Sequence, residues 1–273
     1  MHCTVRVSNS LGTAIKTRHT VPNVRADLYP SYISGATDKI KQYVDKYGDE
    51  GKNELNIVAS KHVIQMSNDP NVSYCGCDIH DGALRILFKD DYLGTNVNDA
   101  LEYLDKAVNA APAPGATINF AARASITKWE PEIATLQQQI GKQLNNPNIK
   151  LNPNWEHNFA ELAKAKDKTE YWDSRLGEYS HNYMKALLDQ LEREKFESDD
   201  LLQEGFAEMV LKGEVCLRVQ PKTKETYNEL TVEDGVLYMS VRRVCLVFTL
   251  VKHLFIFPAS TQQSCIYMDE VLI

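Results

Sequence analysis

The chain has 273 residues, of which 43% are hydrophobic and 25% are charged, a composition typical of a globular protein with a sizeable core. Its net charge is −7, which argues against a protein that binds nucleic acid through a broadly basic surface, so any RNA contact must use a local patch. Residues 1–21 lack the apolar run of a secretory signal, and the apolar run 244–257 is too short to span a membrane. We therefore expect a cytoplasmic protein with no membrane span.

The six cysteines are sparse and match neither a disulfide framework nor a four-ligand zinc site. Cys75 and Cys77 lie close to His80 and Asp81, which suggests a metal cluster at first. A structural zinc site needs a second Cys/His pair, and none follows. We interpret both residues as strand cysteines beside a turn.

The N-terminal part of the sequence is predicted to form helices and strands in alternation. The amphipathic pattern of 31–47 predicts a helix, and the β-branched residues of 54–66 favour a strand. A β-hairpin is predicted for 72–79 and 83–88, because His80-Asp81-Gly82 between them has turn chemistry. A further helix is predicted for 96–110.

The central part predicts mainly helices. After the Pro/Gly/Ala loop 111–117, residues 118–123 are expected to form a strand. The predicted helices that follow are 129–146, with Pro131 in its first turn, then 154–165, 168–196 and 199–212. A short extended segment separates the first two, and Ser198 is the expected N-cap of the last.

The C-terminal part predicts strands at 214–220, 227–232 and 236–241, with a turn at 233–235. Segments 79–86 (IHDGALRI) and 232–239 (VEDGVLYM) are alike, which we interpret as shared turn chemistry rather than duplication. The order of elements favours an α+β fold over a doubly wound sheet. We expect one domain, 1–273, with a sheet-rich lobe (1–125), a helical lobe (126–212) and a C-terminal β lobe (213–273).

One charged pair stands out on the predicted helix 168–196. Taking every fourth residue gives the line Met184, Leu188, Glu192 and Phe196, in which Glu192 lies between apolar neighbours. Lys195 follows three residues later, on the same side. A carboxylate on a buried line is unfavourable unless it is paired or functional. The alternative is that Glu192 and Lys195 form an ordinary surface ion pair.

Three motifs around this pair resemble the ribosome-inactivating proteins, the rRNA N-glycosylases typified by the ricin and Shiga toxin A chains. Residues 136–162 are similar to the family's Leu-rich helix and the short elements after it. The pentapeptide 192–196 (EREKF) is similar to the active-site motif Glu-x-x-Arg-Phe. Residues 202–209 are similar to Leu-x-x-x-Trp-x-x-Leu, with Phe206 at the Trp position. The matching order covers about residues 28–257.

The resemblance implies a ribosome-inactivating-protein-like α+β fold without a lectin chain. It implies a hydrolase that removes adenine from ribosomal RNA, a protein synthesis inhibitor of the plant or fungal defence toxin type. Glu192 would stabilise the oxocarbenium-like transition state and activate water, and Lys195 would assist the leaving adenine. The implied reaction needs no metal and no cofactor, and its partner is ribosomal RNA or another adenine-containing nucleic acid.

The implied substrate contacts are aromatic rings and cations. Trp129, Phe206 and Tyr92 are the candidates for stacking on the flipped adenine. Arg193 would contact RNA phosphate together with a set of lysines: Lys142, Lys150, Lys164, Lys166 and Lys195. The alternatives are that Trp129 and Phe206 are packing residues and that the lysines only solvate a surface.

Two other hypotheses remain open. Lys195 replaces the motif's Arg, Phe206 replaces its Trp, and the position of the first stacking aromatic falls near Ala83 or Leu84. These departures favour a catalytically inactive relative that binds a nucleobase, a nucleotide or a protein. The third hypothesis is an unrelated α+β protein. The sequence leaves the oligomeric state open.

Overall fold

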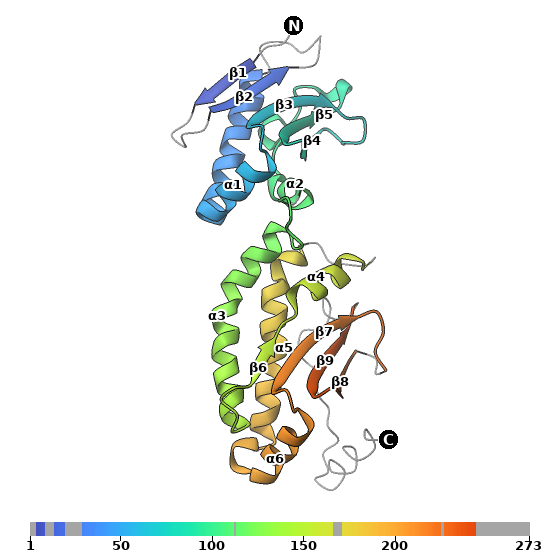
Figure 1. Ribbon diagram of the computed structural model, residues 1–273. Coiled ribbons are helices and arrows are strands. Elements are labelled where there is room, and N and C mark those ends of the chain that lie inside the picture. The colour runs from blue at the N-terminus through green and yellow to red at the C-terminus, as the bar shows by residue number, and fades with distance from the viewer. Residues whose placement is uncertain are drawn as a thin grey trace. The chain divides into compact units, whose positions relative to one another are not determined.

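The structure is a computed structural model that describes residues 4–8, 14–19, 29–111, 113–165, 171–224 and 227–243 (Figure 1). It contains helices and two mixed sheets, which confirms the α+β class. The chain divides into two compact units, unit 1 (Met1–Ala121) and unit 2 (Ala122–Ile273). The helical block and the C-terminal strands, expected as separate lobes, thus belong to the same unit. The apolar run 244–257 lies outside the described residues.

Unit 1 contains a five-stranded sheet with the order β1-β2-β3-β5-β4. Its strands are β1 (Thr4–Ser8), β2 (Ala14–His19), β3 (Val63–Asn68), β4 (Cys75–His80) and β5 (Ala83–Phe88). β3 pairs in parallel with both β2 and β5, whereas β4 and β5 form an antiparallel hairpin. The hairpin predicted from the Asp-Gly turn is confirmed, with Cys75 and Cys77 in the strand before the turn.

The main helix of unit 1 is α1 (Tyr29–Val58), followed by the 3-10 turns η1 (Asp90–Tyr92) and η2 (Val97–Asp99) and by α2 (Leu104–Ala110). α1 buries Tyr32, Ala36 and Ile40, which recur at the helical spacing of four. It extends past the predicted end through a kink at Gly48, whose φ is 61°. Residues 54–58 are therefore helical, and only the end of the expected strand 54–66 is realised in β3.

Unit 2 is built on two long helices that lie side by side, α3 (Phe120–Gln143) and α5 (Leu176–Arg193) (Figure 1). Near their N-terminal ends, the Gly177 N–H donates to Ser125 Oγ at 3.0 Å. At the other end, Gln143 Nε2 donates to Glu197 Oε2 at 3.2 Å, just beyond α5. The two helices therefore run parallel. Gly177 allows the close approach, because a Cβ there would lie 2.3 Å from the Ser125 carbonyl oxygen.

Two predictions for this region are wrong. Residues 120–123 of the expected strand 118–123 are the first turn of α3, because a short apolar run fits a buried helix as well as a strand. Pro131 consequently lies inside α3 and not in its first turn.

The remaining elements complete unit 2. The helices α4 (Trp155–Ala163) and α6 (Asp200–Met209) and the turns η3 (Asp173–Arg175) and η4 (Phe196–Ser198) accompany a sheet of four strands. The sheet order is β6-β7-β9-β8, with bounds β6 (Lys150–Asn152), β7 (Glu214–Gln220), β8 (Asn228–Glu233) and β9 (Val236–Arg242). One face of the sheet is buried through alternate residues such as Val215, Leu217 and Met239. The predicted strands and the helix at 154–165 are confirmed.

Candidate functional site

Glu192 lies in the last turn of α5, and its side chain is exposed. Met184 and Leu188 are buried, so the expected apolar line is correct as far as Leu188. The expectation that Glu192 continues this line is wrong. A line of every fourth residue drifts around a helix by about 40° per step, so Leu191 occupies the next buried position instead.

Lys195 does not belong to the helix that carries Glu192. α5 ends at Arg193, and Lys195 has a left-handed backbone with φ 59° that turns the chain into η4. Its side chain is exposed, as are those of Arg193 and Glu194. The predicted catalytic pair therefore faces solvent, with Glu192 in the last turn of α5 and Lys195 in the turn that follows it.

The surface around this pair is acidic. Residues 192–212 include seven carboxylates and three cations, all exposed, so the net charge of the segment is 3 − 7 = −4. The carboxylates are Glu192, Glu194, Glu197, Asp199, Asp200, Glu204 and Glu208, and the cations are Arg193, Lys195 and Lys212. More than half of the chain's net charge of −7 is concentrated in this segment.

Trp129 packs against α5. Its ring lies on that of His181, with centroids 4.7 Å apart and an angle of 38° between the planes. Lys128 Nζ is 5.7 Å from the Trp129 ring centroid. Nearby, Arg175 binds Glu178 through two hydrogen bonds and lowers the pKa of that carboxyl group. One face of the ring proposed to stack on adenine is thus covered by a neighbouring side chain.

Trp129 and Glu192 lie at opposite ends of the helix pair. His181, the α5 partner of Trp129, precedes Glu192 by 11 residues (192 − 181) in the same helix. At 1.5 Å per residue, these two positions are about 16 Å apart along the axis. A base stacked on Trp129 would therefore be out of reach of the Glu192 carboxylate.

Phe206 is the one predicted stacking residue near the predicted catalytic pair. It lies on α6, half-buried, with its ring edge-to-face against Phe196 at 6.5 Å between centroids. Asp199, not Ser198, is the N-cap of this helix, and its carboxylate accepts from the Leu202 N–H at 3.1 Å. Phe206 and Phe196 contact each other edge to face and stay partly exposed, as packing residues at the edge of a core do.

Tyr92 belongs to unit 1, whereas Glu192 and Lys195 belong to unit 2. It is exposed and lies edge-to-face against Tyr74, with centroids 5.1 Å apart. Lys89 Nζ lies 5.8 Å from the Tyr92 ring centroid.

Two lysines of the expected phosphate-binding patch are paired with carboxylates. Lys142 Nζ is 2.7 Å from Glu197 Oε1, and Lys164 Nζ is 2.5 Å from Glu161 Oε1. Lys150 is exposed on β6, and Lys166 lies outside the described residues. These cations are spread over different elements of unit 2, as lysines that only solvate a surface would be.

Among the described residues, no group of three or more His, Cys, Asp or Glu side chains is arranged to hold a metal ion. Burial raises the pKa of Cys77 to about 12 and that of Cys216 to about 11, so both thiols are protonated at neutral pH. Within the same residues, no helix combines the length and apolar character that a membrane span requires.

The structure adds α6 to the residues of functional interest. Leu201 is 77% exposed on this helix, whereas Gln203 is buried. Gly205 lies in the middle of the helix. These features were visible in the sequence as a glycine inside a predicted helix and as acidic residues four apart, Asp200, Glu204 and Glu208. Which side of the helix faces the core could not be inferred from either.

Comparisons with protein families, with characterised proteins and with solved structures found no match to this chain.

Proposed function

We propose that this protein is a binding module for another protein and that it has no RNA N-glycosylase activity. The observation that carries the proposal is the exposure of both Glu192 and Lys195, on different backbone elements, at one end of unit 2. The proposal corresponds to the inactive-relative hypothesis and commits it to a protein partner. The resemblance to ribosome-inactivating proteins stays a prediction from sequence.

Exposure matters because the proposed catalysis is electrostatic. A carboxylate stabilises a developing oxocarbenium charge strongly only where water is excluded. At 4 Å, two unit charges interact by about 1 kcal/mol in bulk water but by about 4 kcal/mol at the effective dielectric constant of a protein surface. Glu192 in open solvent is at the weak end of this range, and the same holds for Lys195 beside a leaving adenine.

The charge of the segment argues in the same direction. Contacts to phosphate dominate the affinity of proteins for RNA, and they require clustered cations. Residues 192–212 have a net charge of −4, which repels a phosphate backbone. The same segment exposes Leu201 and Leu211 by 77% and 79%, and exposed apolar side chains that form a contiguous patch are characteristic of protein-binding surfaces.

Adenine release tests the proposal directly. The purified protein is incubated with ribosomes and with adenine-rich RNA, and free adenine is quantified by liquid chromatography and mass spectrometry. We expect the wild type, Glu192→Gln and Lys195→Arg, like Glu132→Gln at an exposed position of α3, to release no more adenine than an incubation without protein. Release that falls about a hundredfold in Glu192→Gln alone would overturn the proposal and support the glycosylase reaction.

A further inference from the structure

The apolar side of α6 does not point into the core of unit 2. At about 100° per residue, Leu201, Gly205, Met209, Leu202 and Phe206 form one continuous face of the helix. Leu201 is exposed, and the other four are only half-buried. A helix that stabilises a core normally buries its apolar residues, so the described residues leave much of this face uncovered.

A polar residue attaches α6 to the unit instead. Gln203 is the one residue of α6 that is buried. Its Nε2 donates to the Gln143 carbonyl at 3.1 Å and to the Phe196 carbonyl at 2.8 Å, which ties α6 to the end of α3 and to η4. The Gln143 carbonyl lies in the last turn of α3, where carbonyl groups need donors, whereas the Phe196 carbonyl also accepts from the Asp199 N–H at 3.2 Å. Hydrogen bonds thus orient the helix, and its apolar face does not point into the core of unit 2.

Gly205 lies in the middle of the apolar face. Glycine is among the least favourable residues inside a helix, yet a Cβ at this position would meet no atom within 4 Å. The fold of the described residues therefore gives no reason for glycine here. The absence of a side chain leaves a shallow place between larger apolar neighbours, where the backbone of a second helix can approach closely.

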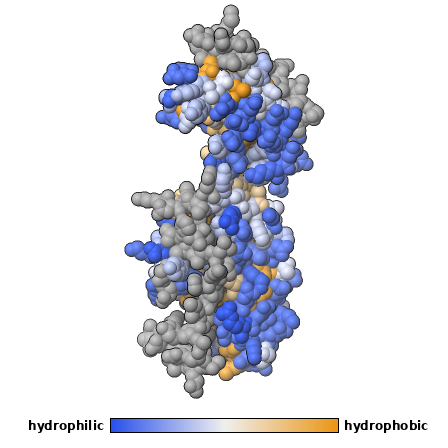
Figure 2. Space-filling view, turned by 180° about the vertical axis from the view of Figure 1, so that it is seen from behind, coloured by the Kyte–Doolittle hydropathy of each residue, from blue (hydrophilic) through white to orange (hydrophobic). Residues whose placement is uncertain are grey.

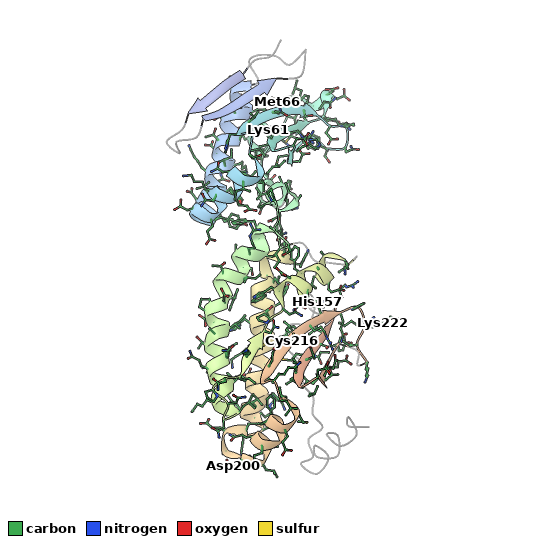
Figure 3. All side chains as sticks on the ribbon, viewed as in Figure 1. Lys61, Met66, His157, Asp200, Cys216 and Lys222 are labelled. Atoms are coloured by element: carbon green, nitrogen blue, oxygen red, sulfur yellow. The ribbon has the colours of Figure 1, made fainter. Side chains whose placement is uncertain are left out.

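An acidic line borders this apolar face. Asp200, Glu204 and Glu208 are spaced four apart, so they form a row along α6 next to Leu201. All three are exposed, and no ion pair within the described part of the chain involves them. Figure 3 shows Asp200 at the outer end of α6, and Figure 2 shows hydrophobic atoms beside hydrophilic ones at this end of unit 2.

We infer that the α6 surface, defined by its apolar residues Leu201, Leu202, Gly205, Phe206 and Met209 together with this acidic row, docks a basic amphipathic helix of a partner protein. The apolar side of such a helix would cover the apolar residues, and its Lys or Arg side chains would pair with the acidic row. The inference rests on the proposed function, since it identifies the partner class of a protein-binding module.

A pair of synthetic helices tests this assignment on the full chain. The first peptide has about five turns of leucines at helical spacing with lysines elsewhere, and the second has glutamates in place of the lysines. Fluorescence anisotropy at 50 and at 300 mM salt measures both affinities. We expect micromolar binding of the Leu/Lys peptide that weakens with salt, and binding of the Leu/Glu peptide that is at least tenfold weaker.

Two matched variants locate the binding to the α6 surface. Gly205→Gln places a side chain in the middle of the apolar face and should weaken Leu/Lys binding at least tenfold while the melting temperature stays unchanged or rises. Ala207→Gln introduces the same residue at an exposed position about 200° around the helix and should leave binding unchanged. Glu204→Gln with Glu208→Gln should reduce the salt dependence, in contrast to Glu130→Gln with Glu132→Gln on α3.

Equal binding by wild type and Gly205→Gln would overturn the inference, and so would equal binding of both peptides. Sedimentation of the wild type tests whether a second copy of this chain occupies the α6 surface. A dimer that Gly205→Gln converts to a monomer would mean that a second copy of this chain covers the face, which also overturns the inference. None of these outcomes depends on adenine release, so the two proposals can fail separately.

Discussion

The two units share one order of four strands. They differ in how the first of these strands, β2 in unit 1 and β6 in unit 2, pairs with the strand beside it. In unit 1, β2 precedes a helix and β3, and the β4–β5 hairpin follows, in the order β2-β3-β5-β4. In unit 2, β6 precedes three helices and β7, and the β8–β9 hairpin follows, in the order β6-β7-β9-β8. The parallel and antiparallel pairings correspond as well.

The difference lies in the first strand of each set. β2 pairs with β3 through four residues, from Lys16↔Val63 to His19↔Met66. β6 pairs with only the first three residues of β7, from Lys150↔Glu214 to Asn152↔Cys216. Among the described residues, the second half of β7 therefore lacks a strand partner on this side, and an exposed edge of this kind invites pairing with other chains.

Asn158 of α4 takes the place of the missing strand residue. Its Nδ2 donates to the Leu217 carbonyl at 3.0 Å, and its Oδ1 accepts from the Val219 N–H at 2.7 Å. A parallel strand would make the same two bonds on either side of Arg218. His157 bonds the Val219 carbonyl at 3.0 Å (Figure 3). In unit 2, a side-chain amide from a helix thus completes the backbone hydrogen bonding at the edge of the sheet.

The largest expected effect is at this amide. Asn158→Ala removes three hydrogen bonds, including one to the Pro153 carbonyl at 2.7 Å, and leaves buried backbone groups of β7 without partners. We expect a loss of about 2–4 kcal/mol in the free energy of unfolding of unit 2. Urea denaturation measures the loss, and hydrogen exchange of β3 and β5 amides shows whether unit 1 is affected.

His157→Gln is the control for this change, since His157 is exposed and makes one such bond; its expected loss is about 1 kcal/mol or less. An Asn158→Ala protein as stable as the control would contradict the strand-replacing role. Faster hydrogen exchange in both units would show that they do not unfold separately.

An intermediate loss of stability is expected at the two hairpin turns, which can be compared directly. Gly82 and Gly235 follow an aspartate and have φ values of 71° and 74°, which other residues rarely adopt. Replacement of either by Ala should destabilise its own unit by about 1–2 kcal/mol. Gly82→Ala should be the more harmful, because its Cβ would lie 2.5 Å from Ser60 Oγ, compared with 3.1 Å from Leu211 Cβ for Gly235→Ala.

Thermal unfolding followed by hydrogen exchange assigns each loss to a unit. Gly205→Ala on α6 is the control, because that glycine has open space around it, and it should be neutral or stabilising by up to about 1 kcal/mol. Equal, near-zero effects at Gly82 and Gly235 would refute the shared turn geometry as a source of stability.

The smallest loss of stability is expected from removal of an ion pair between β7 and β8 in unit 2. Arg218 Nη1 and Nη2 bind Glu233 at 2.9 and 2.6 Å, and hydrogen bonding by this guanidinium lowers the pKa of Glu233 to about 2. Because the pKa is lower in the folded state, the stabilisation is present above the unfolded pKa of about 4.3 and is lost as the pH falls toward 2. With the Glu233 side chain 48% exposed, we expect at most about 1 kcal/mol.

Urea titrations at pH 6 and pH 2.5 measure this contribution in wild type and in Glu233→Gln. The wild type should be more stable at pH 6, and the difference should shrink at pH 2.5. Glu204→Gln, at an exposed position without such a partner among the described residues, should show no pH-dependent difference. A constant difference at both pH values would assign the effect to something other than ionisation of Glu233.

Local chemistry was enough to predict several elements. The Asp-Gly pairs and the alternating apolar residues around them predicted both hairpins, because turn and strand preferences act over a few residues. The similarity of 79–86 and 232–239 was interpreted as turn chemistry alone, whereas the structure shows that matching strand order surrounds both segments. The partner of each preceding strand is distant in sequence, so the similarity alone could not show it.

The sequence by itself determined the α+β class, both hairpins and most of the helices, because these depend on turn residues and on apolar spacing. Tertiary structure decided which side of each helix is buried. Glu192 looked buried from its spacing, yet α5 ends one residue later and Leu191 takes the inner position. The sequence left open which side of the helix 199–212 faces the core, and in α6 the buried Gln203 attaches the helix to the unit while its apolar face stays partly exposed. Such choices depend on contacts between segments far apart in the chain, which local patterns do not contain.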